Sequence, residues 1–261
     1  MMHPMVEAAD RVLRVLQAFG PHERDVSLGD LAQRVGLPKS SVHRLLVTLV
    51  GHGFVERDPS TRRYRLGVRL FELGSTVIHE RGLHSAAHPV LEELSASTGE
   101  TCHLAILSGL EAVYVYKVDG NSSITMSSRV GGRAPCHATS IGKVLTAWVG
   151  EDVLRQLRGH RLRAYTDRTI TSARALEAEL ARVREQGYAL DLEELEEGLR
   201  CVAAPVRDGS GRVVAALGIA GPRRRFQDGH LDRVVPPVVQ AAARLSRNLG
   251  YVEVGAVPAA V

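Results

Sequence analysis

The first 65 residues carry short stretches in which apolar side chains recur at helical spacing. The first stretch runs from about Glu7 to Phe19 and stops at Gly20-Pro21. The second opens at Ser27, with Asp30 three residues later as in a capping box, and ends at Gly36, which suits a left-handed helix cap. The third places apolar residues at i, i+3, i+4, i+7 and i+8, namely Val42, Leu45, Leu46, Leu49 and Val50. We therefore predict three helices, of which the second and third form a helix-turn-helix.

Two short strands are predicted directly after the third helix. Phe54–Arg57 and Tyr64–Leu66 are apolar and β-branched or aromatic in part, and they flank the turn-forming run Asp58–Thr61. A hairpin at this position makes the unit a winged helix-turn-helix. Such a unit binds DNA or serves as a protein-docking module.

The polar side of the third helix carries residue types that contact DNA. Its apolar row packs on the first two helices, so the opposite side is left for the major groove. Lys39 can contact a phosphate, Arg44 can contact guanine in a bidentate manner, and the wing arginines can reach phosphates or the minor groove. The candidate DNA-binding residues are Lys39, Ser40, Ser41, His43, Arg44, Thr48, Arg62 and Arg63. Two alternatives stay open: Ser40 and Ser41 can cap the helix, and the arginines of the hairpin can form an ordinary solvated surface.

The distribution of charge agrees with a nucleic-acid partner for the first part of the chain. Residues 1–65 hold 10 Lys and Arg against 7 Asp and Glu, whereas the other 196 residues hold 23 against 22. The positive excess is therefore concentrated where phosphates would lie. No apolar run approaches the length that spans a bilayer, and the first ten residues do not resemble a secretory signal. Three widely spaced cysteines do not make a disulfide framework, so we expect a cytoplasmic protein.

The rest of the chain alternates between helical and strand patterns, which predicts an α+β domain. Helices are expected over residues 83–97, 139–148, 173–186 and 228–248, the last with a kink at Pro236-Pro237. Strands are expected over residues 102–107, 112–118 and 123–128, and a hairpin over residues 201–206 and 212–219. The small, apolar residues that follow are expected to form a loose tail.

Two regions of the sequence resemble the IclR family of transcription regulators. The run from Leu28 to Leu46, with Gly36-Leu37-Pro38-Lys39-Ser40-Ser41-Val42-His43-Arg44, is similar to that family's DNA-binding domain. The runs 131–143 (GGRAPCHATSIGK) and 198–206 (GLRCVAAPV) are similar to its effector domain. The resemblance extends from about residue 6 to residue 248 in the family's order.

The resemblance implies an architecture and a function. It implies a winged helix-turn-helix over residues 1–66, a linker helix over 67–82, a GAF-like effector-binding domain with a mixed sheet over 83–250, and a tail over 251–261. The partners it implies are a double-stranded DNA operator, a small organic acid as effector, and further copies of the chain in a homodimer or homotetramer. It implies neither a cofactor nor an enzymatic activity.

The residues themselves also point to an effector site at the helix predicted to begin near Thr139. Free backbone N–H groups at Ser140, Ile141 and Gly142 would point out of its positive end, which suits a carboxylate. The resemblance places the effector contacts at Ser123, Met126, Ser140, Ile141, Asp191, Leu199, Cys201, Gly218 and Ala220.

Two of these positions depart from the family's pattern. The family members that sense small hydroxy- or keto-acids have serines at the positions of Gly218 and Ala220. The glycine and alanine offer no hydroxyl group and leave more room, so we expect a larger and less polar acid, such as an aromatic one. Ordinary alternatives remain for several residues here. Cys201 can be a buried small hydrophobe, Asp191 can pair with an arginine, and the acidic run over residues 193–197 is expected to be a solvated loop.

Other chemistries fit the sequence less well. The pairs Cys102-His103 and Cys136-His137 suggest zinc, but neighbouring residues on a strand point to opposite faces, so each pair offers one ligand to a single site. A thiol nucleophile at Cys136 or Cys201 lacks a third, orienting group at a known spacing. We therefore predict no metal site and no catalytic site. Two alternatives stay open for the second domain: an enzyme or metal-dependent sensor, and a module that only mediates oligomerisation.

Overall fold

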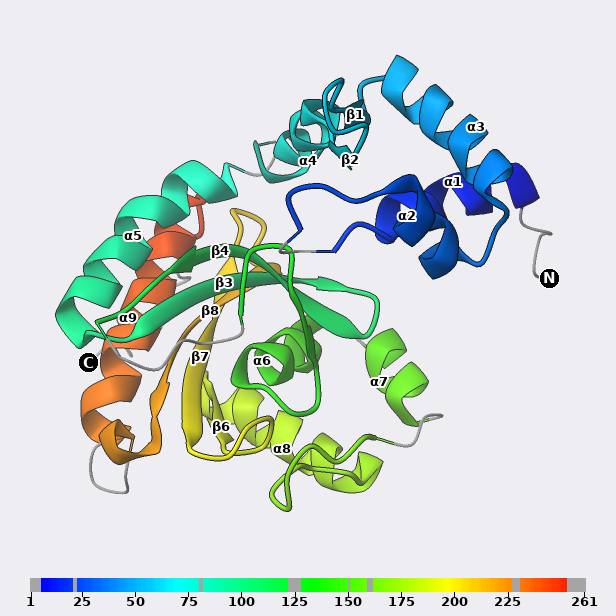
Figure 1. Ribbon diagram of the computed structural model, residues 1–261. Helices are drawn as coiled ribbons and strands as arrows, with labels where there is room; N and C mark the ends of the chain where they lie inside the picture. The colour runs from blue at the N-terminus through cyan, green and yellow to red at the C-terminus, as the bar shows by residue number, and fades with distance from the viewer. Residues whose placement is uncertain are drawn as a thin grey trace, which may run out of the picture. The chain divides into compact units, whose positions relative to one another are not determined.

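The computed structural model describes residues 6–20, 23–79, 82–121, 128–149, 151–158, 162–226 and 231–252. The chain divides into two compact units, Met1–Glu80 and Arg81–Val261 (Figure 1). Each unit has a hydrophobic core of its own. None of the helices in the described part of the chain is long and apolar enough to cross a membrane.

The first unit contains three helices, a two-stranded hairpin and a further helix. In chain order these are α1 (Glu7–Gln17), α2 (Leu28–Val35), α3 (Lys39–Gly51), β1 (Val55–Arg57), β2 (Tyr64–Leu66) and α4 (Val68–His79). The local signals in the sequence account for the ends of α2. The hydroxyl of Ser27 accepts a hydrogen bond from the Asp30 N–H at the start of the helix, and Gly36 ends it at φ 70°. The predicted helix-turn-helix with a hairpin is confirmed.

The core of this unit lies between the helices and β2. Val15 of α1, Leu31 of α2 and Tyr64 of β2 are buried together with the aliphatic row of α3. That row is narrower than predicted. Val42, Leu46 and Leu49 are buried and Leu45 is half-buried, but Val50 is 38% exposed. Val50 lies in the last turn of α3, off the row at residues 42, 46 and 49 that faces the other helices.

Within the described residues, the second unit is built on a six-stranded sheet. Its elements are α5 (Leu83–Thr98), β3 (Thr101–Ser108), β4 (Glu111–Val118), β5 (Arg133–Pro135), α6 (Ser140–Val149), α7 (Glu151–Arg158), α8 (Ala173–Gln186), β6 (Ala189–Leu192), β7 (Leu199–Arg207), β8 (Val213–Pro222), the 3-10 helix η1 (Arg223–Arg225) and α9 (Leu231–Asn248). The strand order is β5-β4-β3-β8-β7-β6. The predicted α+β class is confirmed. Most of the strand expected over residues 123–128, and all but the first two residues of the tail expected over residues 251–261, lie outside the described residues.

Every strand pair of the described sheet is antiparallel, so the expected mixed sheet is wrong. The reason lies in the connections. β3 and β4 form one hairpin and β7 and β8 form another. The helical segment from α6 to α8 connects β5, at one edge of the sheet, to β6, at the other edge. Because β5 and β6 are not adjacent, this connection does not create a pair of parallel neighbouring strands.

The two faces of the sheet are covered by different helices (Figure 1). Val202, Ala204 and Val206 of β7 point to one face, where they pack with residues of α5 and α9. Ala203, between them in sequence, points to the other face and packs with residues of α6 and α8. This alternation is expected for a strand buried on both sides. The seven candidate effector residues that the structure describes lie on the face covered by α6.

Candidate functional site

One candidate site is the exposed side of α3. Lys39, Ser40, His43, Arg44 and Thr48 are exposed there, and Ser41 is half-buried. Neither Lys39 nor Arg44 has a carboxylate partner within 4 Å among the described residues. The cap of α3 is Pro38, without a side-chain hydrogen bond, so the alternative that Ser40 and Ser41 cap the helix is wrong. They lie within its first turn, where side chains can reach a base edge.

The wing presents Arg62 and Arg63 beside a tightly hydrogen-bonded turn. The carboxylate of Asp58 accepts bonds from the N–H groups of Ser60 at 2.7 Å and Thr61 at 2.9 Å, and these bonds, together with the Ser60 hydroxyl, lower the pKa of Asp58 to about 2. Arg62 is exposed and has a φ of 59°. Arg63 is also exposed, but it donates to the Asp25 carbonyl at 3.1 Å. The turn of the wing is therefore fixed by hydrogen bonds, and the Arg63 side chain points back to Asp25 of the same unit.

The second candidate site is a cavity of about 210 Å³ on the α6 side of the sheet. Seven of the nine predicted effector residues line it: Ser140, Ile141, Asp191, Leu199, Cys201, Gly218 and Ala220. The other two, Ser123 and Met126, lie outside the described residues. The sequence analysis missed several other lining residues, among them His103, Tyr114, Ser128, Arg129, Thr139, Leu195 and Glu196.

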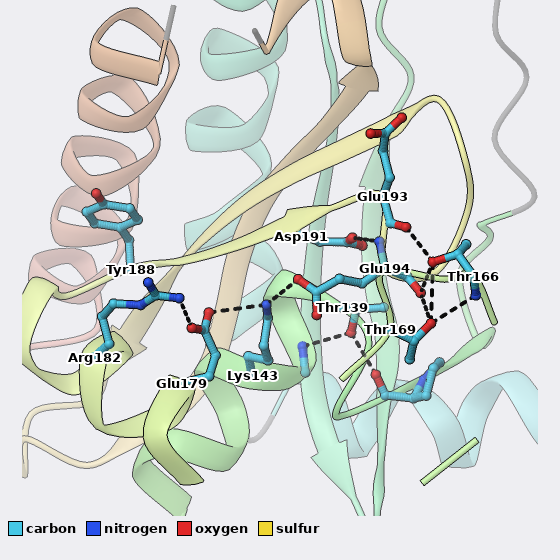
Figure 2. A network of polar contacts seen from close by, with 12 residues as sticks. Thr139, Lys143, Thr166, Thr169, Glu179, Arg182, Tyr188, Asp191, Glu193 and Glu194 are labelled. Atoms are coloured by element: carbon cyan, nitrogen blue, oxygen red, sulfur yellow. Dashed lines mark hydrogen bonds and ion pairs between the residues drawn. The ribbon is translucent and has the colours of Figure 1, made fainter. Parts of the chain in front are cut away.

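The beginning of α6 forms one wall of this cavity. The Thr139 hydroxyl accepts a hydrogen bond from the Gly142 N–H at 3.1 Å and donates to the Pro135 carbonyl at 2.8 Å (Figure 2). The expectation that the Gly142 N–H is free is therefore wrong, because the capping threonine takes it. The N–H groups of Ser140 and Ile141 have no acceptor among the described residues. Two donors at a positive helix end remain for a ligand.

Asp191 and Cys201 face each other on neighbouring strands at the cavity wall. The Asp191 carboxylate accepts a bond from the Glu194 N–H at 2.7 Å, and it has no arginine partner among the described residues, so the arginine alternative is wrong. Burial raises the pKa of Asp191 to about 7, and the Glu194 carboxylate adds to the shift. Burial and the Asp191 carboxylate raise the pKa of the Cys201 thiol well above its ordinary value. Burial also raises the pKa of Cys136, to about 11, so both thiols are protonated and poor nucleophiles near neutral pH.

The acidic run after β6 is not a solvated loop throughout, as had been expected. Glu193 and Glu194 are buried, whereas Glu196 and Glu197 are exposed. The Nζ atom of Lys143, itself 1% exposed, lies 2.6 Å from Oε1 of Glu194 and 3.3 Å from Oε1 of Glu179 (Figure 2). A lysine buried in α6 requires carboxylates, and the loop supplies one of them. An isolated lysine in the apolar run over residues 141–149 was the available signal.

Glu193 is held by a different set of partners. Its carboxylate lies 3.5 Å from Arg223, 3.6 Å from Arg168 and 3.8 Å from Arg200, and its backbone adopts a φ of 69°. The carbonyl of Glu194 accepts hydrogen bonds from the hydroxyl of Thr169 at 2.6 Å. The segment that carries Leu195, Glu196 and Leu199 to the cavity is thus fixed by ion pairs and by its backbone.

A histidine and a tyrosine form the opposite wall. His103 of β3 is 3% exposed, and its Nε2 atom lies 2.7 Å from the hydroxyl of Ser128. Its ring centroid lies 5.0 Å from that of Tyr114. Burial lowers the pKa of His103 to about 4, so the ring is neutral near pH 7. The wall combines aromatic surface with polar groups that carry no charge.

Gly218 has a packing reason to be glycine. A Cβ atom at this position would lie 2.6 Å from the carbonyl oxygen of Val202 on the neighbouring strand. The absence of a hydroxyl group at residue 218 is therefore explained by packing and is weak evidence about the ligand. The expectation of a less polar cavity floor depends on Ala220 alone. Ala220 lines the cavity and is 5% exposed.

Both units match known protein families. Residues 8–59 match the IclR helix-turn-helix domain, and residues 75–247 match the C-terminal domain of the bacterial transcriptional regulator IclR. The chain belongs to the IclR family. Its order of domains is the one that the sequence resemblance implied, and the predicted family is confirmed.

IclR-family relatives align over nearly the full chain. The transcriptional regulators XynR and KdgR of Escherichia coli strain K12 are both 42% identical to it. The alignment with XynR covers 95% of this chain and 99% of XynR, and that with KdgR covers 94% of each. Among solved structures, an IclR homologue from Microbacterium hydrocarbonoxydans complexed with 4-hydroxybenzoate is 29% identical, with a TM-score of 0.84 over 93% of this chain and 99% of that one. The protein is thus an IclR-family transcription regulator with a DNA-binding helix-turn-helix and a C-terminal effector domain.

The part of the chain that the structure describes has no group of three His, Cys, Asp or Glu side chains placed to hold a metal ion. The fold separates the two members of the Cys102-His103 pair. Cys102 is buried in the α5 side of the sheet, whereas its neighbour His103 lines the cavity on the other side. The IclR-family relatives are named as regulators, in agreement with a site that binds a ligand.

Proposed function

We propose that this IclR-family regulator binds operator DNA through α3 and the wing, and that a small organic acid in the cavity changes its affinity for the operator. The observation that carries the proposal is the pair of N–H groups at Ser140 and Ile141, which open into a largely buried cavity without an acceptor among the described residues. A carboxylate at this position gains two hydrogen bonds and the field of the helix. The cytoplasm, where the operator lies, is the compartment that we assign.

The walls favour an aromatic acid over a short aliphatic one. Ile141 and Leu199 offer apolar surface, and the rings of Tyr114 and His103 offer flat surface against which an aryl group can pack. A volume of about 210 Å³ leaves room for a single ring with its substituents. The complex of the Microbacterium hydrocarbonoxydans homologue with 4-hydroxybenzoate supports this choice.

On the DNA side, we assign base contacts to the first turns of α3 and phosphate contacts to its flanks. Ser40, Ser41, His43, Arg44 and Thr48 would face base edges, with Arg44 as the guanine reader. The three remaining candidates, Lys39, Arg62 and Arg63, would contact phosphates or the minor groove. In this assignment residues 1–66 bind DNA, residues 67–82 link them to the second domain, and residues 83–250 bind the effector.

The regulator would act as a homodimer, alone or paired into a homotetramer. Apolar side chains of α4 are exposed within the first unit, with Val68 at 62%, Phe71 at 74% and Leu73 at 45%. Exposed apolar surface of this kind marks a protein interface. A twofold dimer would protect a pseudo-palindrome with half-sites about 34 Å apart.

The test joins calorimetry with a gel-shift assay on the full chain. A panel of 4-hydroxybenzoate, benzoate, pyruvate and glyoxylate is titrated into the protein, and each acid is then added to a protein–operator complex. We expect one or more aromatic acids to bind and to shift operator affinity, and the short keto-acids to bind more weakly. Operator binding that no acid changes, together with the absence of calorimetric heat for the panel, would leave the second domain as an oligomerisation module.

A further inference from the structure

The cavity already contains a carboxyl group where the proposed effector would bring another. Asp191 is 2% exposed and lines the same cavity as the free N–H groups of Ser140 and Ile141. Two ionised carboxylates in a small, partly buried space repel each other, and one of them then keeps a proton. Which of the two keeps it depends on the charges that surround them.

The cations near Asp191 are already paired with other carboxylates. Lys143 of α6 is shared between Glu194 of the following loop and Glu179 of α8. Arg182 also contacts Glu179, and its own side chain is 68% exposed. These groups amount to three carboxylates, Asp191 included, against two cations. Burial raises the pKa of Asp191 and outweighs the charge of Lys143, which acts to lower it, so little of that charge remains to compensate a further anion in the cavity.

The other strands present neutral groups to Asp191. Burial keeps His103 of β3 unprotonated near neutral pH, and it raises the pKa of Tyr114 of β4 and of Cys201 of β7, so that both keep their protons. At the rim of the cavity the lining arginines are exposed, and one of them, Arg133, is paired with Glu111 at 3.0 Å. The other, Arg129, is also exposed, so its charge is screened by solvent.

We propose that the effector binds as a carboxylate together with one proton, which Asp191 takes up. This inference rests on the proposed function. In its protonated form Asp191 still accepts from the Glu194 N–H and can donate a hydrogen bond as well. Asp191 and the effector then carry one negative charge between them instead of two, and the further lining carboxylate, Glu196, is exposed to solvent.

The proton goes to Asp191 because that carboxyl holds protons more strongly. Its pKa in the free protein is about 7, whereas an ordinary carboxyl group has a pKa of about 4. A bound anion raises the pKa of Asp191 further. Below pH 7 Asp191 is already protonated, so binding takes up few protons. Above pH 7 uptake approaches one, and the affinity falls by up to about tenfold per pH unit until the pKa of the complex is reached.

The experiment measures proton uptake by calorimetry in phosphate and in Tris, whose ionisation enthalpies differ. The probe is 4-hydroxybenzoate, or the panel acid that binds most tightly if that is a different one. We expect about 0.1 proton taken up per acid bound at pH 6 and more than about 0.5 at pH 8. In Asp191→Asn, which cannot ionise, uptake should vanish at both pH values and Kd should become independent of pH. Glu197→Gln, which removes an exposed carboxylate of the same loop, should keep the wild-type uptake.

Two outcomes would overturn the inference while leaving the proposed function intact. One is tight acid binding with an uptake at pH 8 within about 0.2 of that at pH 6. The other is an Asp191→Asn protein that still takes up the proton, which would assign it to a different group. Absence of binding by every acid would remove the proposed function and this inference together. If Asp191→Asn fails to fold, as circular dichroism would show, the number of protons that the wild-type protein takes up at pH 6 and pH 8 tests the inference by itself.

Discussion

The ammonium of Lys143 lies 2.6 Å from Oε1 of Glu194, and each of the two side chains is less than 10% exposed. The two residues are separated by 51 positions in sequence. Their contact, drawn in Figure 2, attaches the loop after β6 to α6. The first turn of α6 lines the cavity. Because the backbone N–H of Glu194 also bonds to Asp191, the ion pair fixes the position of the carboxyl that the effector would meet.

Lys143→Met should destabilise the protein by about 3–5 kcal/mol, because it leaves Glu194 buried without its cation and removes one of the two cations that contact Glu179. Urea denaturation of the wild type and the variant gives the difference. Arg182→Ala is the matched control. It removes a largely exposed partner of the same Glu179 and should cost less than about 1 kcal/mol. Equal losses in the two variants would contradict a special role for the buried pair.

Arg44→Ala should weaken specific operator binding by about 1–3 kcal/mol and relax the base preference at its contact. The guanidinium is exposed on α3 and has no carboxylate partner within 4 Å among the described residues, so the fold should be unaffected. Gel-shift titrations on operator and on random duplexes separate the contribution of base-specific contacts from that of phosphate contacts. Arg11→Ala, on α1 and outside the predicted DNA-binding residues, serves as a control that should leave operator affinity unchanged. An equal loss on both duplexes would reassign Arg44 to a phosphate.

Ile141→Arg should reduce acid binding by more than about 100-fold, because the long side chain replaces a lining residue of a cavity of about 210 Å³. Operator binding in the absence of acid should stay at the wild-type level, which shows that the variant is folded. Calorimetry and gel shift measure the two properties. A variant that still responds to the effector as the wild type does would move the effector site elsewhere.

Ala220→Ser should improve the binding of hydroxy- or keto-acids relative to larger acids by roughly 2- to 12-fold, which corresponds to one hydrogen bond of about 0.5–1.5 kcal/mol. The ratio of the two calorimetric Kd values is the readout. Gly218→Ser makes a useful contrast, because its Cβ would lie 2.6 Å from the Val202 carbonyl and should cost stability instead. An unchanged ratio in Ala220→Ser would show that residue 220 does not set the preference.

Local sequence signals were sufficient for much of the fold. Ser27 and Gly36 mark the ends of α2 because a cap depends on neighbours a few residues away. The strands β5 and β6, of 3 and 4 residues, were missed. The strands β1 and β2 are as short, but the turn-forming run between them indicated a hairpin.

Features of the site that depend on contacts between residues far apart in sequence could not be predicted. The burial of Glu194 follows from Lys143, and the need for glycine at residue 218 follows from how closely the Val202 strand approaches. Neither relation appears in a local pattern. The family resemblance correctly assigned seven residues to the cavity. It did not indicate that the lysine near Asp191, Lys143, is already ion-paired with Glu179 and Glu194.

The two faces of the sheet differ in how they tolerate substitutions, and this has a consequence for how ligand preference can change. The side covered by α5 and α9 is a continuous apolar cluster, including Leu91, Leu104, Leu217 and Leu245, where almost any change costs packing energy. The side covered by α6 holds the cavity, whose shape is set by single side chains such as Ile141 and Ala220. Substitutions can accumulate around the cavity while the opposite cluster keeps the strands in register. If the cavity binds the effector as proposed, single substitutions at positions such as Ala220 would be enough to change the ligand preference while the strands stay in register.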